Sequence, residues 1–480
     1  MKLTVTLACA CLLSAATAQA DDGIRQFLAA RAKHDSEVAQ SIWKWAEVGY
    51  QEVKSSALLQ EQLSAAGFAV EAGVAGMPTA FVVSWGSGQP VIGILAEFDA
   101  LPGISQDLSP LRKPLSGKQS GHACGHHLFG AASVAAAIAL KDWLQRSGTT
   151  GTIRLYGTPA EEGGAGKVYM VRAGLFRDVG AILHWHPADL NSAALDRSLA
   201  NKTVKFRFHG VSAHASGAPE RGRSALDGVE AMNHMVNMLR EHVPSDVRLH
   251  YVITSGGSAP NVVPDFAESY HYVRHADPRV VEEIFSRVVK AAEGAALGTG
   301  TTVDYEVIGG VYNLLPNETL ARVMYSKLSE VGGVSYTDEE QAFARQLYSS
   351  LIAPNMPLGS EAVVQAFEFE RPGIGSTDVA DISWNVPTTG LRTATWVPGT
   401  SAHSWQAIAA GGMSIGHKGM HNAAQILALT GQELFSRPAL IAKARAELES
   451  RRGSDFHYRP LLGERDPPLD YRRGVQGGGD

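Results

Sequence analysis

Strand-like and helix-like segments alternate along the first half of this chain, and this alternation limits its possible folds more than any other feature. The strand-like runs cover residues 79–85, 91–96, 152–156 and 181–186, and the helix-like stretches between them cover 128–143 and 167–175. Parallel strands need long crossover connections, which a helix usually supplies. The pattern predicts an α/β fold whose mainly parallel sheet has helices on both faces.

The pattern changes near Leu199, where two strand–helix units of antiparallel character begin. The strands are expected at 203–208, 248–254, 267–273 and 301–307, and the helices at 225–241 and 279–292. We expect a smaller α+β domain over residues 199–311, inserted between two parts of the larger domain, 21–198 and 312–450. Residues 451–480 lack periodicity and are predicted to be a disordered tail.

Residues 1–20 have the composition of an export signal. Lys2 supplies a positive start, Leu3 to Ala16 form an apolar core, and Ala18-Gln19-Ala20 is a small-x-small cleavage site. The mature protein is therefore expected to be periplasmic or secreted. The rest of the sequence contains no run of about 18 apolar residues, so no membrane span is expected. The net charge of −6 gives no reason to expect a nucleic-acid partner.

Cys124 is expected to be the only cysteine of the mature chain, because Cys9 and Cys11 lie in the export signal. A single thiol in an oxidising compartment has no disulfide partner. His126 follows two residues later, and the acidic pair Glu161-Glu162 comes further along the chain. Thiolate, imidazole and carboxylate form a typical ligand set for a transition metal, with zinc the leading candidate.

Further candidate residues follow other strands of the expected α/β domain, where open sheets place their sites. They are Asp99, Glu161, Glu162, His184, His186 and His403. Each residue is ambiguous alone, since a single histidine is more often a core residue and an acidic pair is usually solvated. Five clusters at strand ends together favour a metal site. The rival G-x-S-x-G motif at 412–416 follows a small-residue helical stretch instead of a strand, which argues against a serine hydrolase.

Amide hydrolysis with metal ions needs an activated water, a Lewis acid at the carbonyl and a base that takes the proton. Adjacent carboxylates such as Glu161 and Glu162 cannot both point the same way. One of them could bind metal while the other acts as the base.

Together these motifs resemble a known family over residues 35 to 435. The chain is similar to the binuclear metallo-amidohydrolases that include aminoacylase, hippurate hydrolase, the plant auxin-conjugate hydrolases and glutamate carboxypeptidase. The resemblance implies a metal-binding α/β domain with an inserted lid domain that also makes the dimer. It also implies two divalent metal ions, Zn²⁺ or Mn²⁺ first among them.

The resemblance assigns roles residue by residue. The metal ligands that it implies are Cys124, His126, Glu162, His186 and His403. His186 is preferred over His184 because its interval of 24 residues from Glu162 fits the family without a gap. Glu161 would be the catalytic base, and Asp99 would orient a metal-site residue. His127 stands where the common pattern has Asp, which implies altered surroundings for the metal.

Two motifs of the inserted domain complete the resemblance. Residues 210–216 resemble the lid motif whose histidine, here His214, reaches the partner subunit's site and steadies an oxyanion. Residues 256–265, with Asn261, and the later Arg274 resemble the segment that holds a substrate carboxylate.

Within the family, residues 97–106 and 185–187 are most similar to the p-aminobenzoyl-glutamate hydrolase branch. This implies hydrolysis of the amide bond of an N-acyl or N-aroyl amino acid, with release of the free amino acid. The alternatives are a dipeptidase or carboxypeptidase with the same site, or a catalytically silent binding or partner subunit. The resemblance leaves both a homodimer and a paired-subunit assembly open.

Overall fold

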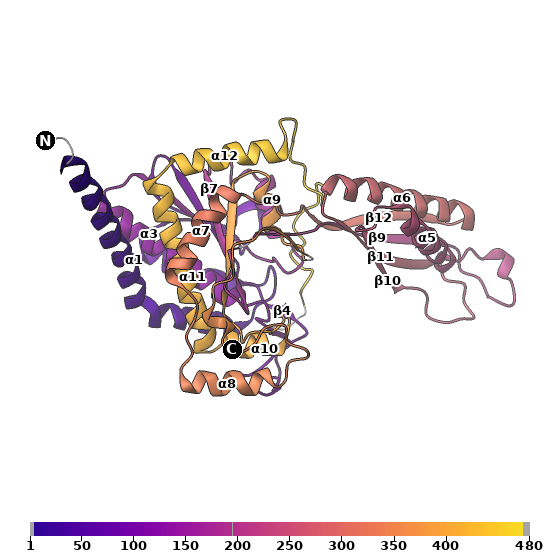
Figure 1. Ribbon diagram of the computed structural model, residues 1–480. Coiled ribbons are helices and arrows are strands. Elements are labelled where there is room, and N and C mark those ends of the chain that lie inside the picture. The colour runs from indigo at the N-terminus through magenta and orange to yellow at the C-terminus, as the bar shows by residue number, and fades with distance from the viewer. Residues whose placement is uncertain (1–3, 194, 374, 474–480) are drawn as a thin grey trace.

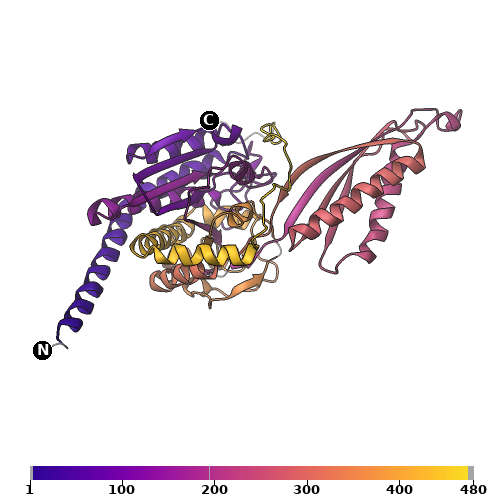
Figure 2. The same ribbon diagram turned by 90° about the horizontal axis from the view of Figure 1, so that it is seen from above.

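A computed structural model describes residues 4–193, 195–373 and 375–473, and it divides the chain into a larger and an inserted domain. The inserted domain projects from one side of the larger domain as an elongated body (Figures 1 and 2). The chain leaves the larger domain before β9 and returns to it after β12, so the smaller domain is an insertion in sequence as well as in space.

A six-stranded sheet forms the centre of the larger domain, in the order β1-β2-β6-β3-β7-β14. Its strands are β1 (Ala69–Ala72), β2 (Phe81–Ser87), β3 (Val91–Ala96), β6 (Gly151–Gly157), β7 (Ala181–Ala188) and β14 (Thr388–Ala394). The pairings among β6, β3, β7 and β14 are parallel, while β1 and β2 are antiparallel. The predicted α/β class with a mainly parallel sheet is therefore confirmed.

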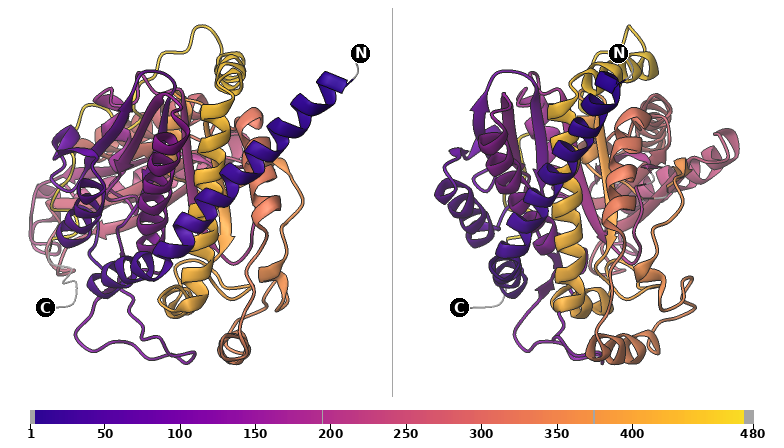
Figure 3. Two further views of the ribbon diagram at one scale, coloured as in Figure 1. Left: turned by 90° about the vertical axis from the view of Figure 1, so that its left-hand side faces the viewer. Right: turned by 60° about the vertical axis from the view of Figure 1, so that its left-hand side comes forward.

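Three long helices form one packed layer of the larger domain. They are α1 (Thr4–Trp45), α3 (His126–Ser147) and α11 (Ser414–Ser436). Figure 3 shows α1 crossing α3 and α11, and α3 also contacts strands β3, β6 and β7. Helix α3 is rich in alanine, and its small buried side chains let neighbouring helices and the sheet approach closely. The segment 4–20, part of the predicted export signal, forms the first part of α1.

The remaining elements of the larger domain are shorter. The helices are α2 (Val53–Ala65), α4 (Gly166–Arg172), α7 (Glu318–Val331), α8 (Asp338–Tyr348), α9 (Val379–Ser383), α10 (Trp405–Gly411) and α12 (Ala439–Arg452). Two-stranded pairs are made by β4 (Leu101–Pro102) with β5 (Ser120–Gly121) and by β8 (Leu195–Arg197) with β13 (Phe369–Pro372). Among the described residues, no helix has the length and apolar content that a membrane crossing would require.

The inserted domain is an antiparallel sheet with two helices. The sheet has the order β10-β11-β9-β12, with β9 (Ala200–His209), β10 (Arg248–Ser255), β11 (Phe266–His275) and β12 (Thr302–Val311). Helices α5 (Ala225–Leu239) and α6 (Pro278–Thr299) pack against each other and against this sheet. Both begin at a side-chain cap, since Ser224 accepts from Asp227 N and Asp277 accepts from Arg279 N.

The C-terminal segment corrects one prediction. We expected a disordered tail over 451–480, but α12 continues to Arg452 and residues 453–473 pack on the rest of the protein; residues 474–480 lie outside the described part. Leu461 and Leu462 are buried, and Arg465 Nη1 donates to the carbonyl oxygens of Val307 and Ile308 in β12. The segment therefore joins the inserted domain to the larger one. Its contacts are irregular, so the sequence carries no periodic pattern from which they could be predicted.

This packing can be tested with Leu462→Ala. Leu462 is 2% exposed, and truncating a buried leucine leaves a cavity, so we expect the free energy of unfolding to fall by about 2–4 kcal/mol. Leu297→Ala is the matched control, because Leu297 is 86% exposed and its truncation should change stability by about 0.5 kcal/mol or less. Thermal unfolding of both variants gives the comparison. Equal thermal unfolding midpoints for the two variants would contradict the packing of the C-terminal segment.

Candidate metal centre

The predicted metal-site residues converge at the carboxyl edge of the parallel strands. Glu97 and Asp99 follow β3, Glu161 and Glu162 follow β6, and His186 lies near the end of β7. His403 lies in the loop after β14. Because β6, β3, β7 and β14 run parallel, the segments that follow them emerge on one side of the sheet.

Cys124, His126 and His186 form the first candidate metal group, with one ligand atom of each within 4.8 Å of the others. Cys124 Sγ lies 3.4 Å from His186 Nε2. The tight loop that brings Cys124 and His126 here requires Gly125, whose φ is +78° and whose added Cβ would lie 2.6 Å from Pro187 Cβ. His186 Nδ1 lies 2.7 Å from the Pro187 carbonyl oxygen, which leaves Nε2 facing the group.

Cys124, Glu162 and His403 form the second group, also within 4.8 Å of one another. His403 Nε2 lies 3.2 Å from Glu162 Oε1. His403 has a φ of +61°, which is uncommon for a residue with a side chain, and its N–H donates to the Ala123 carbonyl at 2.9 Å. Cys124 belongs to both groups, so the arrangement suits two ions that share the sulfur.

The carboxylate of Asp99 joins these groups. Its Oδ1 lies 2.8 Å from His126 Nδ1, and its Oδ2 accepts a hydrogen bond from the Glu162 backbone N–H at 2.9 Å. Asp99 thereby holds the His126 ring by one nitrogen and leaves Nε2 directed at the site. This placement agrees with the positioning role that the resemblance implies for Asp99.

A third group consists of Glu97, His126 and Glu161. Glu97 is a residue that the sequence analysis missed. It is 1% exposed, and its partner Lys167 is buried completely, with Nζ 2.8 Å from Glu97 Oε1 and 2.7 Å from Asp378 Oδ1. Glu97 and Asp99 are two apart just beyond a strand, so the alternation of side chains could have indicated that they share a side.

The other histidines of these motifs point elsewhere. His184 lies on β7 with its ring over Gly390, and it belongs to no candidate group among the described residues. His122 and His127 are buried, with Nε2 atoms 3.1 Å from the Ile42 carbonyl and 3.0 Å from the Gly411 carbonyl. His127, at the position where the family pattern has Asp, thus bonds to the α10 backbone.

The protonation chemistry of the first group suits a metal ion. Burial, with the nearby Glu162 carboxylate, raises the pKa of the Cys124 thiol, whereas burial and then His126 lower the pKa of His186 to about 4. Burial opposes a charge on His126, but Cys124, Glu97 and Asp99 outweigh it and raise its pKa. A cation would replace the protons of Cys124 and His126 and neutralise the acids around them.

Unpaired buried atoms provide a direct test of the fit. Glu97 Oε2 and His126 Nε2 lie 3.2 Å apart, and Glu162 Oε1 lies 3.2 Å from His403 Nε2, yet none of these buried atoms makes a well-aligned hydrogen bond. Buried polar atoms are rarely left in this state, and sulfur, nitrogen and oxygen donors that converge on one space are what a divalent transition metal requires. The residues present therefore fit two metal ions.

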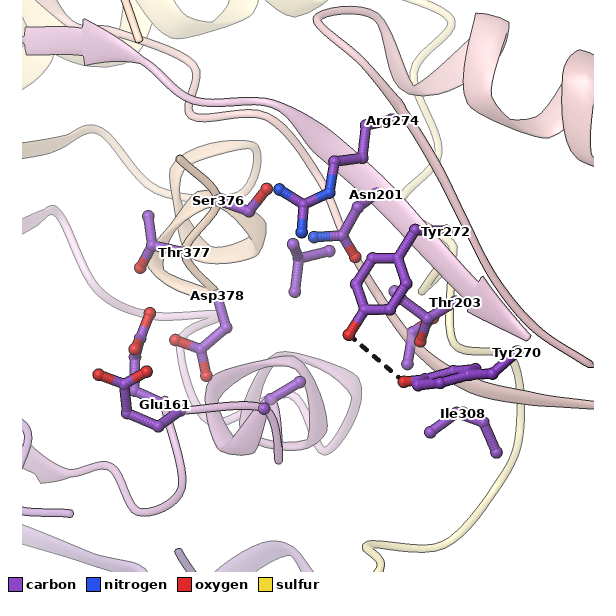
Figure 4. Close-up of a pocket in the computed structure, with 16 residues that line it drawn as sticks. Glu161, Asn201, Thr203, Tyr270, Tyr272, Arg274, Ile308, Ser376, Thr377 and Asp378 are labelled. Atoms are coloured by element: carbon purple, nitrogen blue, oxygen red, sulfur yellow. Dashed lines mark hydrogen bonds between the residues drawn. The ribbon is translucent and has the colours of Figure 1, made fainter. Parts of the chain in front are cut away.

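Glu161 lines a cavity of about 220 Å³ between the two domains. Desolvation raises the pKa of its carboxyl well above the usual value, and the Glu97, Glu162 and Asp378 carboxylates raise it further. Figure 4 shows Glu161 and Asp378 on one wall of this cavity and Arg274 on the opposite wall.

The wall that the inserted domain contributes is polar. Its side chains include Asn201, Thr203, Tyr270, Tyr272 and Arg274. The Arg274 guanidinium lies over the Tyr272 ring at 5.1 Å, and its buried Nε has no hydrogen-bond partner. A fixed cation among hydroxyl and amide groups can bind a carboxylate.

The two residues expected to hold a carboxylate together, Asn261 and Arg274, lie at opposite ends of the inserted domain. Arg274 pairs with Asn201 at the end of β11 near the larger domain. Asn261 is exposed in the loop before β11, where its carbonyl accepts from Ala215 N, beside His214. The eight-residue step from Phe266 to Arg274 alone spans about 27 Å of extended strand. One chain therefore cannot bring Asn261 and Arg274 to one carboxylate.

His214 is exposed on a neighbouring distal loop, the one that follows β9. Its Nδ1 accepts from Gly217 N at 3.1 Å, which leaves Nε2 free to face another molecule. Within one chain neither His214 nor Asn261 reaches the candidate metal centre.

The C-terminal segment supports the acidic loop from behind. Tyr471 Oη and Arg472 Nη2 donate to the Glu162 carbonyl oxygen at 3.2 Å and 2.7 Å. The Ala160 N–H of the same loop donates to Glu52 Oε1 at 2.8 Å. Contacts from two distant parts of the chain thus hold the loop of Glu161 and Glu162 in place.

Comparisons with known proteins agree with this arrangement. Residues 200–299 match the family described as the peptidase dimerisation domain of the M20 group. Over 452 residues the chain is 38% identical to a subunit of p-aminobenzoyl-glutamate hydrolase from Escherichia coli (strain K12), and the match covers 89% of this chain and 94% of that protein. Over 430 residues it is 28% identical to the Xaa-Arg dipeptidase of Mus musculus, with 86% and 88% covered.

The fold has solved counterparts as well. A dinuclear metal-binding peptidase of the M20 family from Bacillus subtilis superposes with a TM-score of 0.58 at 18% identity, over 85% of this chain and 99% of that one. At this identity the likeness concerns the fold.

The protonation states predict how metal affinity depends on pH. In the metal-free protein the raised pKa values leave Cys124 and His126 protonated at neutral pH, and both must lose a proton to bind metal. We expect the affinity for Zn²⁺ to rise between about pH 6 and 8, with release of about two protons per chain. Calorimetry in buffers of different ionisation enthalpy measures this release, and Cys124→Ala should release fewer protons. Affinity that is flat with pH would contradict the assignment.

Proposed function

This chain belongs to the M20 family of metal-dependent hydrolases, and from that premise we propose that it hydrolyses the amide bond of an N-acyl or N-aroyl amino acid, releasing the free amino acid. The observation that carries the proposal is the pair of candidate metal groups that share Cys124, with Glu161 beside them in the lining of a cavity. p-Aminobenzoyl-glutamate is the first substrate to test, because the relative at 38% identity is named for its hydrolysis.

We assign the metals to Cys124, His126 and His186 on one side and to Cys124, Glu162 and His403 on the other. Two divalent ions, Zn²⁺ or Mn²⁺, would polarise the substrate carbonyl and lower the pKa of a bound water. Thiolate and imidazole donors favour Zn²⁺ over Mn²⁺.

Glu161 is the base in this proposal. It belongs to neither of the groups that share Cys124, and it faces the cavity from the loop that also holds Glu162. A carboxyl with a raised pKa is a stronger base when it is ionised, so Glu161 can take a proton from water and pass it to the leaving amine.

Arg274 anchors the substrate in this proposal. Its guanidinium faces Glu161 across the cavity, and its Nε lacks a protein partner. A carboxylate bound there would place the neighbouring amide bond toward Glu161. The cavity of about 220 Å³ is smaller than a typical pocket for a drug-sized ligand and suits the amino-acid part of the substrate alone.

We propose that His214 and Asn261 act in a second subunit. Both lie on the distal loops of the inserted domain, away from the metal centre of their own chain. Exposed apolar side chains surround these loops, including Val211, Val262 and Phe266, as expected for a surface that another subunit covers. A homodimer would supply the missing pair; association with a different subunit is the alternative.

The proposal also covers where the protein works. We propose that the protein works in the periplasm or outside the cell, on the support of the apolar segment and predicted cleavage site within residues 1–20.

A dipeptidase is the second candidate function, favoured by the 28% identity with Xaa-Arg dipeptidase. A silent binding subunit is the third candidate, and the presence of Glu161 beside a full donor set argues against it.

The first test combines metal content with substrate turnover. Purified protein is expected to contain about two metal ions per chain and to release amino acids from N-acyl amino acids or p-aminobenzoyl-glutamate more readily than from dipeptides. Glu161→Gln should retain the metals and lower kcat by about a thousandfold or more, because the base is lost while the ligands stay. Mass spectrometry of metals and amine release from the substrate panel provide the readouts. Substantial residual activity in Glu161→Gln would refute the assigned base.

A complementation experiment tests the action of His214 in trans. His214→Ala and Glu161→Gln should each be inactive as homodimers. After subunit exchange at equal amounts, half of the dimers are mixed, and each mixed dimer has one site with both residues intact, so about a quarter of wild-type activity is expected. Mixtures that stay inactive while dimers exchange would place His214 in its own subunit's site or outside catalysis.

A further inference from the structure

We propose that Arg472 and Tyr471, in the C-terminal segment, are positioning residues for the loop that carries Glu161 and Glu162. They act through the backbone of this loop and not on the substrate. The inference rests on the proposed function, in which Glu161 is the base and Glu162 a metal ligand. The sequence motifs assign no role to this end of the chain.

The carbonyl oxygen of Glu162 is the point of contact. It accepts hydrogen bonds from Arg472 Nη2 at 2.7 Å and from Tyr471 Oη at 3.2 Å. On the other side of the same residue, the Glu162 N–H donates to Asp99 Oδ2 at 2.9 Å. Side chains from distant parts of the chain therefore hold both peptide groups that flank Glu162, which limits the directions that its carboxylate can take.

The loop needs such support because its backbone is strained. Ala160 and Ala165 have φ angles of +57° and +56°, a region that residues with a side chain rarely occupy. Gly163, between them, has a φ of +99°. Strained conformations of this kind persist only where the surrounding structure holds them. Since Glu161 and Glu162 lie within this segment, the contacts that hold its backbone also set their positions.

Tyr471 is packed into the surroundings of the loop. Its ring meets that of Tyr50 edge to face, with centroids 5.7 Å apart, and Tyr50 Oη donates to the Gly164 carbonyl oxygen at 2.8 Å. Residue 49 must be glycine for this packing, because a Cβ added at Gly49 would overlap Tyr471 Oη. The two tyrosines thus pack together, and each donates to a carbonyl oxygen of the loop.

Contacts along the preceding residues keep this end of the chain in place. Arg172 Nη1 donates to the Arg465 carbonyl oxygen at 2.8 Å, and Gln51 Nε2 donates to the Leu469 carbonyl oxygen at 2.8 Å. Leu469 lies only two residues before Tyr471. The donors to the loop are therefore presented by a segment that is itself bonded to the larger domain.

A shift of the loop would change both parts of the proposed chemistry. Glu162 Oε1 lies 3.2 Å from His403 Nε2 in the second candidate metal group, so a rotation of the Glu162 peptide would move a ligand. Glu161 directly precedes Glu162 and lines the cavity. Removing a contact that orients a ligand typically costs about tenfold to a hundredfold in metal affinity or activity.

Arg472→Ala tests the proposal, with Co²⁺ as the probe because its visible spectrum reports binding and coordination. We expect one of the two bound ions to be held about tenfold to a hundredfold more weakly than in the wild-type protein. At saturating Co²⁺, kcat should fall about tenfold or more, because a misplaced base is a poorer catalyst. KM should change less than about twofold, since Arg274 is untouched. Arg472→Lys keeps a donor and should recover part of both losses.

Arg473→Ala is the matched control. It removes the same charge from an exposed neighbour whose side chain forms no hydrogen bond or ion pair with other described residues, so cobalt affinity and kcat should stay at wild-type values. The thermal unfolding midpoint of each metal-free variant reports folding. Tyr471→Phe covers the case in which Arg472→Ala fails to fold, because it removes a single hydroxyl and should give a smaller loss of the same kind.

Wild-type cobalt affinity and kcat in folded Arg472→Ala would overturn the proposal, as would equal losses in Arg473→Ala. A different outcome separates this proposal from the proposed function. If the wild-type protein turns over no acyl amino acid and no dipeptide, but Arg472→Ala still weakens one cobalt ion, the proposed function fails and the positioning of the metal site by Arg472 stands.

Discussion

The buried carboxylate of Asp99 is the contact on which the candidate metal centre depends. One oxygen holds the ring of His126, and the other holds the backbone of Glu162, so a single side chain sets the relation between the two metal groups. It can reach both because β3, which precedes it, lies between β6 and β7 in the sheet. The order of the strands thus determines which loops Asp99 can join.

Around this contact the protein concentrates negative charge that has few cations to balance it. Glu97, Asp99, Glu161 and Glu162 lie close together, with Lys167 as a buried counter-charge. Such a cluster is unfavourable in a dry interior unless cations or protons neutralise it. The acidic loop is also held by the C-terminal segment and by Glu52, so the folded chain maintains an arrangement that becomes favourable when metal binds.

Much of this could be predicted from the sequence, because regular elements and strand-end residues leave periodic signals. The alternation of strands and helices predicted the sheet, and His186 reaches the first group whereas His184 does not. Glu97 was missed although its two-residue spacing from Asp99 could have indicated that both side chains lie on the same side. The C-terminal tail packs through single contacts that leave no periodic pattern in the sequence. The separation of Asn261 from Arg274 depends on the length of β11, which runs from one end of the inserted domain to the other. Helix α8 was not predicted, although the sequence contains its capping box, formed by Thr337 and Glu340.

The central claim is that one sulfur joins two metal groups, and anomalous X-ray scattering from crystals grown with Zn²⁺ tests it most directly. The account predicts two peaks per chain on either side of Cys124 Sγ, one beside His126 and His186 and the other beside Glu162 and His403. A single peak, or two peaks that do not share Cys124, would contradict it.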